Sequence, residues 1–248
     1  MRPIYDDIGI NYASNRQTDP RIAGQIQTLL KGARRILNIG AGSGSYEPEE
    51  ADLVALEPSS AMIAQRKPES HPVIQGVVEQ LPFEDDSFSH AMSILSMHHW
   101  ENQAKAFGEI NRVATDRFVA LTWNPEAEPF WLTRDYFPEF HQRDKIIFPS
   151  VGELSTHFET VEAYAVPIPD DCVDGFMAAY WKRPEAYLDE GIRASISAFA
   201  RLSDPTEGLR RLESDIKSGR WEEKNRAILD QSTLDAGFII VSAQIENA

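Results

Sequence analysis

Cysteine and long apolar runs are both scarce in this chain of 248 residues. The lone Cys172 excludes a framework of intramolecular disulfides and a metal site built from several thiolates. No apolar run approaches the roughly 18–20 residues that a membrane-spanning helix needs. Residues 1–17 also lack the apolar stretch of about 7–15 residues found in a secretory signal peptide. We therefore expect a cytoplasmic protein without a membrane anchor.

Basic residues are in deficit, since 24 Lys and Arg stand against 39 Asp and Glu and give a formal net charge of −15. Proteins that bind nucleic acid or anionic membranes usually present a basic face, because neutralising phosphates drives that affinity. The charge balance therefore favours a small-molecule partner over nucleic acid or a membrane. It leaves the choice between a monomer and a homodimer open.

Short apolar runs recur between residues 35 and 123. They are rich in Ile, Val and Leu and do not alternate cleanly with polar residues, which is typical of strands buried on both faces of a parallel sheet. The five runs are RILNIG (35–40), DLVALE (52–57), PVIQGV (72–77), HAMSILSM (90–97) and RFVALTW (117–123). Between them, SSAMIAQR and NQAKAFGEINRVA predict helices, the second with Phe107, Ile110 and Val113 on one face. This alternation predicts an α/β fold with a doubly wound sheet.

The alternation stops after Trp123. Residues 124–150 are rich in proline and aromatic side chains, which indicates a loop or a helical lid. TVEAYAVPI and, near the C-terminus, GFIIVSAQI predict two late strands, and helical patterns fill residues 170–235 between them. The expected organisation is an N-terminal helical arm (1–34), a core (35–169 plus 236–248) that includes a lid segment (124–150), and a helical cap inserted at 170–235.

A glycine-rich turn, ILNIGAGSGS, follows the first predicted strand. Gly40, Gly42 and Gly44 allow a tight turn and a close approach of the backbone to a ligand. The dinucleotide fingerprint G-x-G-x-x-G needs its third glycine one residue later, so the sequence does not predict a turn that binds a pyrophosphate. Glu57 ends the second predicted strand, where an acid accepts hydrogen bonds from the ribose hydroxyls of an adenosine group. A solvated loop acid or a helix cap is the alternative for Glu57.

Three segments, ILNIGAGSG, LVALEPSSAMIAQR and GVVEQLPFEDDSFSHAMSILSMHHW, together resemble the class I S-adenosylmethionine-dependent methyltransferases, and among them the type 11 small-molecule group. The similarity covers roughly residues 5–123. It implies a mostly parallel seven-stranded sheet of the Rossmann-like methyltransferase fold. It also implies S-adenosylmethionine as cofactor, S-adenosylhomocysteine as product, and methyl transfer by in-line displacement to an oxygen, nitrogen or carbon atom of a small metabolite.

The resemblance assigns cofactor contacts to individual residues. They are Gly40, Ala41, Gly42 and Gly44 beneath the methionine and ribose, Glu57 on the ribose, Pro58 and Met62 beside the adenine, Val78 and Glu79 on its other edge, and Ser96. Tyr12 and Arg16 of the N-terminal arm would face the cofactor, with Arg16 holding the methionine carboxylate through paired N–H donors. A surface arginine is the alternative for Arg16.

The chain departs from the family pattern at three places. Val77 stands where an acid often binds the adenine amino group, so that contact falls to the backbone or to Glu79. Ser89 replaces the acid that usually starts the fourth strand. Finally, the short segment between Gly44 and Asp52 predicts only one or two turns for the first helix of the fold.

His98 and His99 follow the fourth predicted strand at the carboxyl edge of the sheet, where ligands of doubly wound folds bind. Metal binding is not expected, because neighbouring side chains point apart and no nearby Cys or third His completes a site. A neutral imidazole can take the proton of a hydroxyl or ammonium acceptor, whereas a carboxylate or an enolised carbon needs no base. Both histidines are therefore candidate catalytic bases, and the alternative is that they form the pocket wall.

Three tryptophans, Trp100, Trp123 and Trp131, are candidate substrate contacts, because aromatic rings can exclude water and sandwich a flat molecule. Most other aromatic residues after Trp123 are expected in the core of the cap. Two other functions fit the same motifs. One is an NAD(P)-dependent oxidoreductase on a Rossmann sheet, which the glycine spacing disfavours. The other is a non-catalytic cofactor-binding protein.

Overall fold

A seven-stranded sheet in the order β3-β2-β1-β4-β5-β9-β6 forms the centre of the computed structural model, which describes residues 16–246. Its strands are β1 (Ile36–Ile39), β2 (Leu53–Glu57), β3 (Val73–Gln75), β4 (Phe88–Ile94), β5 (Ala114–Trp123), β6 (Thr160–Ala165) and β9 (Phe238–Gln244). Strands β1 to β5 pair in parallel, and β9 runs antiparallel to its neighbours β5 and β6. The predicted doubly wound, mostly parallel seven-stranded α/β fold is confirmed.

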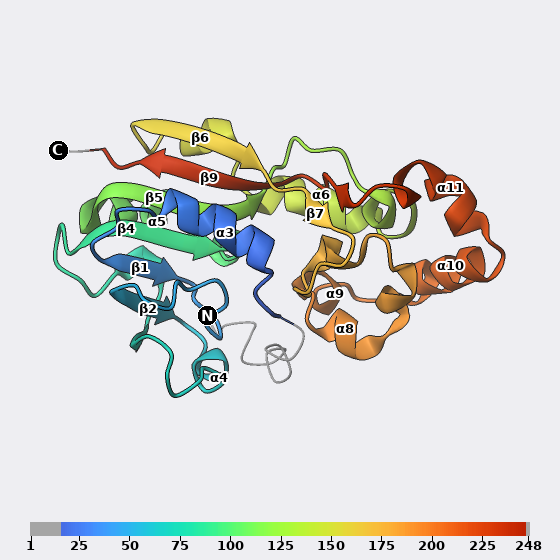
Figure 1. Ribbon diagram of the computed structural model, residues 1–248, viewed down its shortest axis with the longest axis horizontal. Helices are drawn as coiled ribbons and strands as arrows, with labels where there is room; N and C mark the ends of the chain where they lie inside the picture. Colours follow the sequence, from blue (N-terminus) through green and yellow to red (C-terminus); the bar gives the residue numbers. More distant parts are fainter. Residues whose placement is uncertain (1–15, 247–248) are drawn as a thin grey trace.

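The strand order reverses at β1, which lies between β2 and β4. All four residues of β1 are buried, because helices cover both faces of the sheet there (Figure 1). From β1 the chain runs outward through β2 to β3 and then crosses back to β4 on the other side of β1. At such a reversal a crevice opens beyond the carboxyl ends of the two central strands, here β1 and β4. The fold therefore places its ligand crevice beside the glycine-rich turn.

The two faces of the sheet carry separate apolar layers. Helix α3 (Pro20–Leu29) begins at the N-cap Asp19 and buries Ile22 and Ile26 against one face. Helices α5 (Gln103–Val113) and α7 (Val151–Leu154) cover the other face. The predicted apolar side of α5 is buried as expected, and removing each such side chain from water stabilises the fold by about 1.5–3 kcal/mol.

Residues 40–52, all of them described, form no helix between β1 and β2, so the prediction of one or two helical turns is wrong. The positive φ angles of Gly42, Gly44 and Tyr46 bend the backbone too tightly for a helix. A buried ion pair fills the space instead: Arg66 Nη2 lies 2.7 Å from Glu47 Oε2, and the side chains are 4% and 5% exposed. Asn38 also donates to Glu47 at 2.9 Å, so the buried carboxylate keeps hydrogen bonds that offset its desolvation.

A second body of helices packs beyond the carboxyl ends of the strands, at the right of Figure 1. It comprises the π-helix η4 (Leu132–Tyr136), α6 (Pro138–Ile147), the 3-10 helices η5 (Met177–Tyr180) and η6 (Pro184–Leu188), and α8 (Glu190–Ala194), α9 (Ser197–Ala200), α10 (Thr206–Lys217) and α11 (Arg220–Leu229). The two-residue strands β7 (Ile168–Pro169) and β8 (Thr233–Leu234) pair where the chain enters and leaves it. Its core joins Trp131 and Phe137 to Tyr187, Phe199 and Trp221, so the lid segment packs on the inserted helices.

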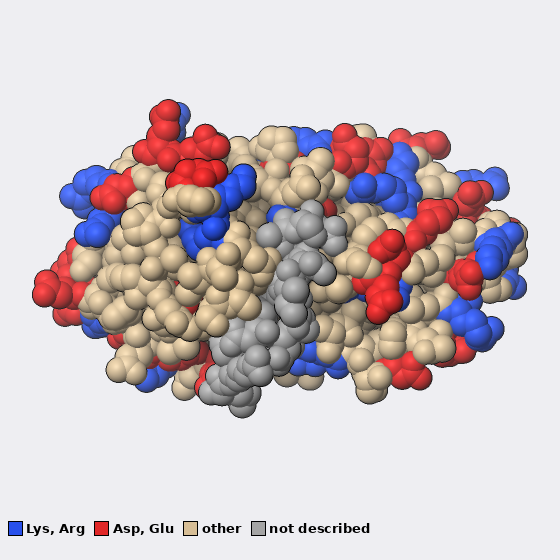
Figure 2. Space-filling model, turned by 90° about the horizontal axis from the view of Figure 1, so that it is seen from below, with Lys and Arg blue, Asp and Glu red and all other residues tan. Residues whose placement is uncertain are grey.

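Acidic and basic side chains are interspersed on the face that Figure 2 shows, without a continuous basic field. Within residues 16–246, none of the helices combines the length and apolar character needed to cross a membrane.

Candidate functional site

The glycine-rich turn leaves the carboxyl end of β1 with Gly40, Gly42 and Gly44 at φ of +67°, +54° and +97°. Residues with a Cβ are strained in this region of backbone space. A Cβ on Gly40 would also lie 2.5 Å from Ser96 Oγ, so no larger residue fits between the ends of β1 and β4. Ser96 donates to the carbonyl of Ile39 at 3.0 Å. The predicted glycines and Ser96 thus meet at one point of the crevice.

Glu57 lies beneath the turn. Its carboxylate accepts hydrogen bonds from the backbone N–H of Gly42 at 2.8 Å and of Ser59 at 2.9 Å. Ser59 in turn caps the short helix α4 (Ser60–Ile63), accepting from the N–H of Met62 at 3.2 Å. Glu57 therefore joins the predicted adenine side of the site to the glycine turn.

The other predicted cofactor residues lie around this turn. Met62 is buried, and its Cε lies 3.3 Å from where a Cβ on Gly42 would stand. Val78 is buried at the start of the 3-10 helix η2 (Val78–Gln80), and half-buried Pro58 follows Glu57. The carboxylate of Glu79 accepts from the N–H groups of Glu101 and Asn102 at 2.8 and 3.1 Å, so it holds the segment before α5.

The departure at Ser89 has a structural explanation. Its hydroxyl accepts from the backbone N–H of Arg34 at 2.8 Å and of Arg35 at 3.2 Å. Ser89 therefore fastens the start of β4 to the segment that enters β1, at the end of the sheet opposite the crevice. This serine organises the sheet and lies away from the glycine turn.

Arg16 reaches from the N-terminal segment to the inserted helices. Its Nε lies 2.7 Å from Asp174 Oδ1, and the two side chains are 9% and 0% exposed. The buried partner carboxylate also accepts a hydrogen bond from the hydroxyl of Tyr46 at 2.9 Å. The other predicted arm residue, Tyr12, lies outside the described residues.

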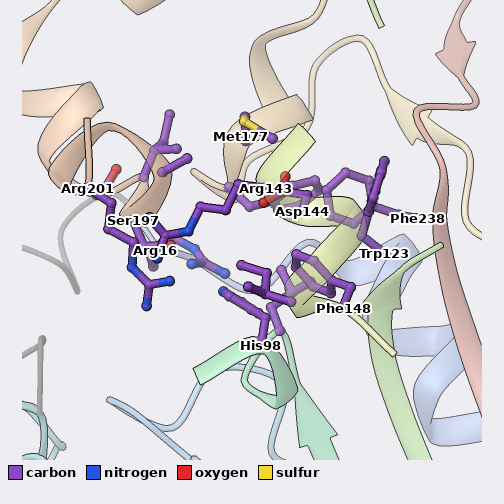
Figure 3. Close-up of a pocket in the computed structure, with 16 residues that line it drawn as sticks. Arg16, His98, Trp123, Arg143, Asp144, Phe148, Met177, Ser197, Arg201 and Phe238 are labelled. Carbon is purple, nitrogen blue, oxygen red and sulfur yellow. The ribbon is translucent and has the colours of Figure 1, made fainter. Parts of the chain in front are cut away.

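A cavity of about 640 Å³, including its open mouth, lies beyond the ends of β4, β5 and β9 (Figure 3). Its walls are Arg16, Leu95, His98, Trp123, Arg143, Asp144, Ile147, Phe148, Phe176, Met177, Ser195, Ile196, Ser197, Ala198, Arg201 and Phe238. The cavity therefore collects residues from the arm, the sheet, the lid segment and the cap.

Of the three predicted substrate contacts, Trp123 alone lines this cavity. Trp100 packs edge-on against Phe107, 5.7 Å between ring centroids, with the apolar layer on one face of the sheet. Trp131 is 2% exposed and donates to the carbonyl of Trp181 at 2.7 Å inside the cap. Other side chains cover Trp131, whereas Trp100 is partly buried and lies outside this cavity.

His98 and His99 occupy the single 3-10 turn η3 (Met97–His99) directly after β4. Their ring centroids are 3.9 Å apart, so the expectation that the two side chains point apart is wrong. Phe148 stacks on His98 at 4.3 Å and Arg201 lies 2.5 Å from His99 Nδ1, and these contacts hold the rings together. Within residues 16–246, no group of three or more His, Cys, Asp or Glu side chains could hold a metal ion.

Both imidazoles are neutral. Burial, followed by the positive charge of Arg201, lowers the pKa of His99 to about 3. Burial also holds the pKa of His98 well below its usual value, and His99 and Arg201 lower it further. A hydrogen-bond partner for His98 Nδ1 is missing among residues 16–246, although the ring lines the cavity. This orphan nitrogen is a ready hydrogen-bonding position for a bound molecule.

Sequence reasoning missed two charged residues of α6 that line the cavity, Arg143 and Asp144. Asp144 is 8% exposed, and its carboxyl makes no hydrogen bond or ion pair within residues 16–246. Burial raises the pKa of Asp144 to about 7, although Arg143 and Arg201 act to lower it. The signal was present, because Asp144 lies four residues after Phe140 and four before Phe148, on the buried side of the helix.

The family model described as a methyltransferase domain matches residues 37–117, which include the glycine turn, β2 to β4, most of β1 and the first residues of β5. A crystal structure from Anabaena variabilis, described as a "putative methyltransferase from antibiotic biosynthesis pathway", is 32% identical to this chain with a TM-score of 0.85. The alignment covers 92% of this chain and 98% of that one. The chain belongs to the class I methyltransferases of type 11.

More distant relatives fit this methyltransferase assignment. A chloroplast 2-methyl-6-phytyl-1,4-hydroquinone methyltransferase from Oryza sativa is 27% identical over 135 residues, which are 50% of this chain and 37% of the rice protein. The chain thus aligns with well under two thirds of that relative. Phosphoethanolamine N-methyltransferase 2 of Haemonchus contortus, solved with S-adenosyl-L-methionine, has a TM-score of 0.52 at 17% identity, covering 91% of this chain and 53% of that one. A likeness at this identity shows the fold alone.

Proposed function

We propose that this methyltransferase moves a methyl group from S-adenosylmethionine to an oxygen, nitrogen or carbon atom of a small metabolite bound in the cavity. The observation that carries the proposal is the proximity of two features at the end of β4. Ser96 contacts the glycine turn, and His98, two residues later, lines the cavity. A cofactor on the turn and an acceptor in the cavity would therefore meet near His98.

The residues present fit the cofactor. Gly40, Gly42 and Gly44 have positive φ angles, which give the tight turn of backbone that the cofactor would lie against. The side chains of Ser96, Met62 and Arg66 lie where a Cβ on these glycines would stand, so larger residues do not fit there. Glu57 provides buried carboxylate oxygens for ribose hydroxyls, and Met62 and Val78 provide an apolar edge for adenine. When bound, S-adenosylmethionine supplies an electrophilic methyl group on a sulfonium. The chain has to align the acceptor with that methyl, and such positioning can contribute about 7–11 kcal/mol of barrier lowering.

Proton removal is needed where the acceptor atom is a hydroxyl or an ammonium nitrogen. Asp144 is the best matched base in the cavity, because its pKa of about 7 allows it to accept a proton near neutral pH. His98 and His99 are weaker proton acceptors, since their pKa values lie far below 7. We therefore assign Asp144 as the base that takes the proton from the acceptor atom. The histidines form the wall of the cavity, and His98 Nδ1 hydrogen-bonds the acceptor.

The same proposal divides the chain by role. Residues 35–169 with 236–248 hold the cofactor, and residues 1–34 close over it from the arm side. The cap at 170–235 and the lid segment 124–150 shape the acceptor cavity, with which Arg143, Asp144 and Met177 are in contact.

Titration calorimetry of the purified protein with S-adenosylhomocysteine tests the cofactor assignment. We expect micromolar binding to the wild type and to a Glu222→Ala control, whose exposed carboxylate lies in the first turn of the cap helix α11. Glu57→Ala should lose at least about tenfold in affinity, because hydrogen bonds to a charged group contribute about 1.5–3 kcal/mol. NADH should not bind. Absence of S-adenosylhomocysteine binding to the wild type, or binding of NADH in its place, would refute the proposal.

A further inference from the structure

We propose that the methyl acceptor is an acid with an apolar body, whose carboxylate or phosphate oxygens are bound by Arg143 and Arg201 at one end of the cavity. This substrate class rests on the proposed function, since it takes the cavity as the acceptor site. Three features of the cavity support it: a guanidinium that forms no ion pair within residues 16–246, a lining carboxylate that is only partly charged near neutral pH, and an aromatic wall at the opposite end.

Arg143 is the first feature. It projects from α6, and its guanidinium makes no ion pair or hydrogen bond within residues 16–246. Arg16 differs, because Asp174 neutralises it at 2.7 Å. Figure 3 shows the side chains of Arg16, Arg143 and Arg201 gathered on one side of the cavity, with Ser197 beside them. In a chain of net charge −15, an arginine that faces a cavity and has no carboxylate partner in the described part of the chain indicates an anionic ligand.

Among residues 16–246, no ion pair balances the charge of Arg143 at the cavity. Asp144 is the carboxylate among the lining residues, and with a pKa of about 7 it is only partly charged near neutral pH. The positive field reaches the neighbouring histidines, because Arg201 and Arg143 both act to lower the pKa of His99 after burial has done so. An ammonium ligand would meet this field unfavourably, whereas an oxyanion would be attracted by it.

The geometry of guanidinium groups fits oxyanions of two kinds. A guanidinium presents parallel N–H donors that match carboxylate and phosphate oxygens in pairs. Arg201 already donates to His99 Nδ1 at 2.5 Å, which fixes one of its nitrogens and orients the rest of the group. Arg143 and Arg201 come from different segments, α6 and the end of α9, so they can approach one anion from two sides.

The opposite end of the cavity is apolar. Phe148 stacks on His98 at 4.3 Å and meets Trp123 edge-on at 5.8 Å, which makes a continuous aromatic wall leading away from the arginines. Met177 and Phe238 complete that end (Figure 3). A ligand with one anionic and one apolar end would satisfy both halves of the cavity, with its middle near Asp144 and His98. Polar molecules such as sugars would leave the aromatic wall uncovered.

The test uses calorimetry with three probes that share a phenyl ring: phenylacetate, phenyl phosphate and the neutral phenylacetamide. Each is titrated into the full-length protein with and without saturating S-adenosylhomocysteine. We expect at least one acid to bind about tenfold or more tightly than the amide, and the tighter acid identifies carboxylate or phosphate as the preferred group. Arg143→Gln and Arg201→Gln should each reduce that binding about tenfold or more, because a charge-assisted hydrogen bond is lost. Arg210→Gln, the same charge change on the surface of α10, should leave it within about twofold.

Three results would overturn the inference. The first is binding of the amide as tightly as the better acid. The second is unchanged acid binding in Arg143→Gln. The third is an equal loss of S-adenosylhomocysteine and acid binding in that variant, because Arg143 would then serve the cofactor. The titrations without S-adenosylhomocysteine keep this result separate from the proposed function, which fails only if the thioether product itself does not bind.

Discussion

The hydroxyl of Tyr46 donates a hydrogen bond of 2.9 Å to Asp174 Oδ2, and this contact joins the glycine-turn loop to the cap. Tyr46 is buried in the loop that replaces the first helix of the fold, while Asp174 lies at the entrance of the inserted segment. Arg16 binds the other oxygen of the same carboxylate at 2.7 Å. The arm, the cofactor turn and the cap therefore share one buried polar cluster. A substitution in one of these parts should therefore also destabilise the other two.

Removing the Tyr46 hydroxyl should weaken that junction. In Tyr46→Phe, Asp174 keeps the donors of Arg16 and of the Gly175 N–H but loses one buried hydrogen bond. We expect the free energy of unfolding in urea to fall by about 1–3 kcal/mol, together with weaker binding of S-adenosylhomocysteine. Tyr164→Phe is the matched control, since its hydroxyl bonds to Glu162 on the exposed strand β6. Equal stability of the two variants would contradict the role of the cluster.

Gly40→Ala should damage the cofactor turn for two separable reasons, its positive φ and the 2.5 Å approach of the new Cβ to Ser96 Oγ. We expect S-adenosylhomocysteine affinity to fall at least about tenfold and the free energy of unfolding by about 1–3 kcal/mol. Adding Ser96→Gly relieves the steric clash and leaves the φ strain. Partial recovery of stability in the double variant supports the stated geometry. A single variant that binds like the wild type would refute it.

The centre of the fold could be predicted from the sequence because strands β1, β2, β4 and β5 are mostly buried. RILNIG, DLVALE and RFVALTW each became a strand of the parallel sheet, and Phe107, Ile110 and Val113 lie on the buried side of α5 as their spacing predicts. Propensity and packing agree in those segments. The loop after Gly44 was predicted less well, since a buried Arg66–Glu47 pair, 19 residues apart in sequence, occupies the place of a helix. A local sequence pattern does not predict an ion pair between residues so far apart in the chain.

The cavity was only partly predictable. The position of the motifs in the sequence was sufficient to predict that His98 lies at the end of β4 beside Ser96, and Trp123 at the end of β5. Arg143 and Arg201, by contrast, meet only because the lid segment and the cap pack on each other. The ring contacts that cover Trp131 are likewise tertiary. Residues that converge from distant segments need the folded chain to identify them, whereas the carboxyl edge of a parallel sheet follows from topology.

Arg201 is expected to contribute to the low pKa of His99. Arg201→Gln removes the nearest positive charge and the 2.5 Å contact with Nδ1, so the pKa of His99 should rise above about 3. It should stay below its usual value, because burial remains the largest cause of the shift. The imidazole proton resonances followed by NMR between pH 3 and 8 measure this. Arg210→Gln should leave the titration unchanged, and an unshifted His99 in Arg201→Gln would contradict the assignment.

Asp144 should make the stability of the protein depend on pH. Its folded pKa of about 7 lies above the ordinary 3.8, so the folded chain binds this proton more tightly than the unfolded chain does. The stabilising contribution is complete below about pH 4 and is lost as the pH rises through about 7. We expect Asp144→Asn to become more stable relative to the wild type over that interval, by up to about 4 kcal/mol at pH 8. Urea unfolding of both proteins at several pH values measures the difference.

The histidines make stability depend on pH in the opposite direction to Asp144, so the variant is compared with the wild type at each pH. Burial lowers the pKa of His98 and His99, so their unfolded forms bind protons more tightly and stability falls as the pH drops below about 6.5. That loss is common to the wild type and Asp144→Asn and cancels in their difference. Asp204→Asn is the control, because hydrogen bonds from Thr206 lower the pKa of Asp204. The stability of this variant relative to the wild type should therefore fall as the pH rises, opposite to Asp144→Asn. A stability difference between Asp144→Asn and the wild type that does not change from pH 4 to 8 would show that Asp144 is ionised like a surface carboxylate, and would remove it as the base for methyl transfer.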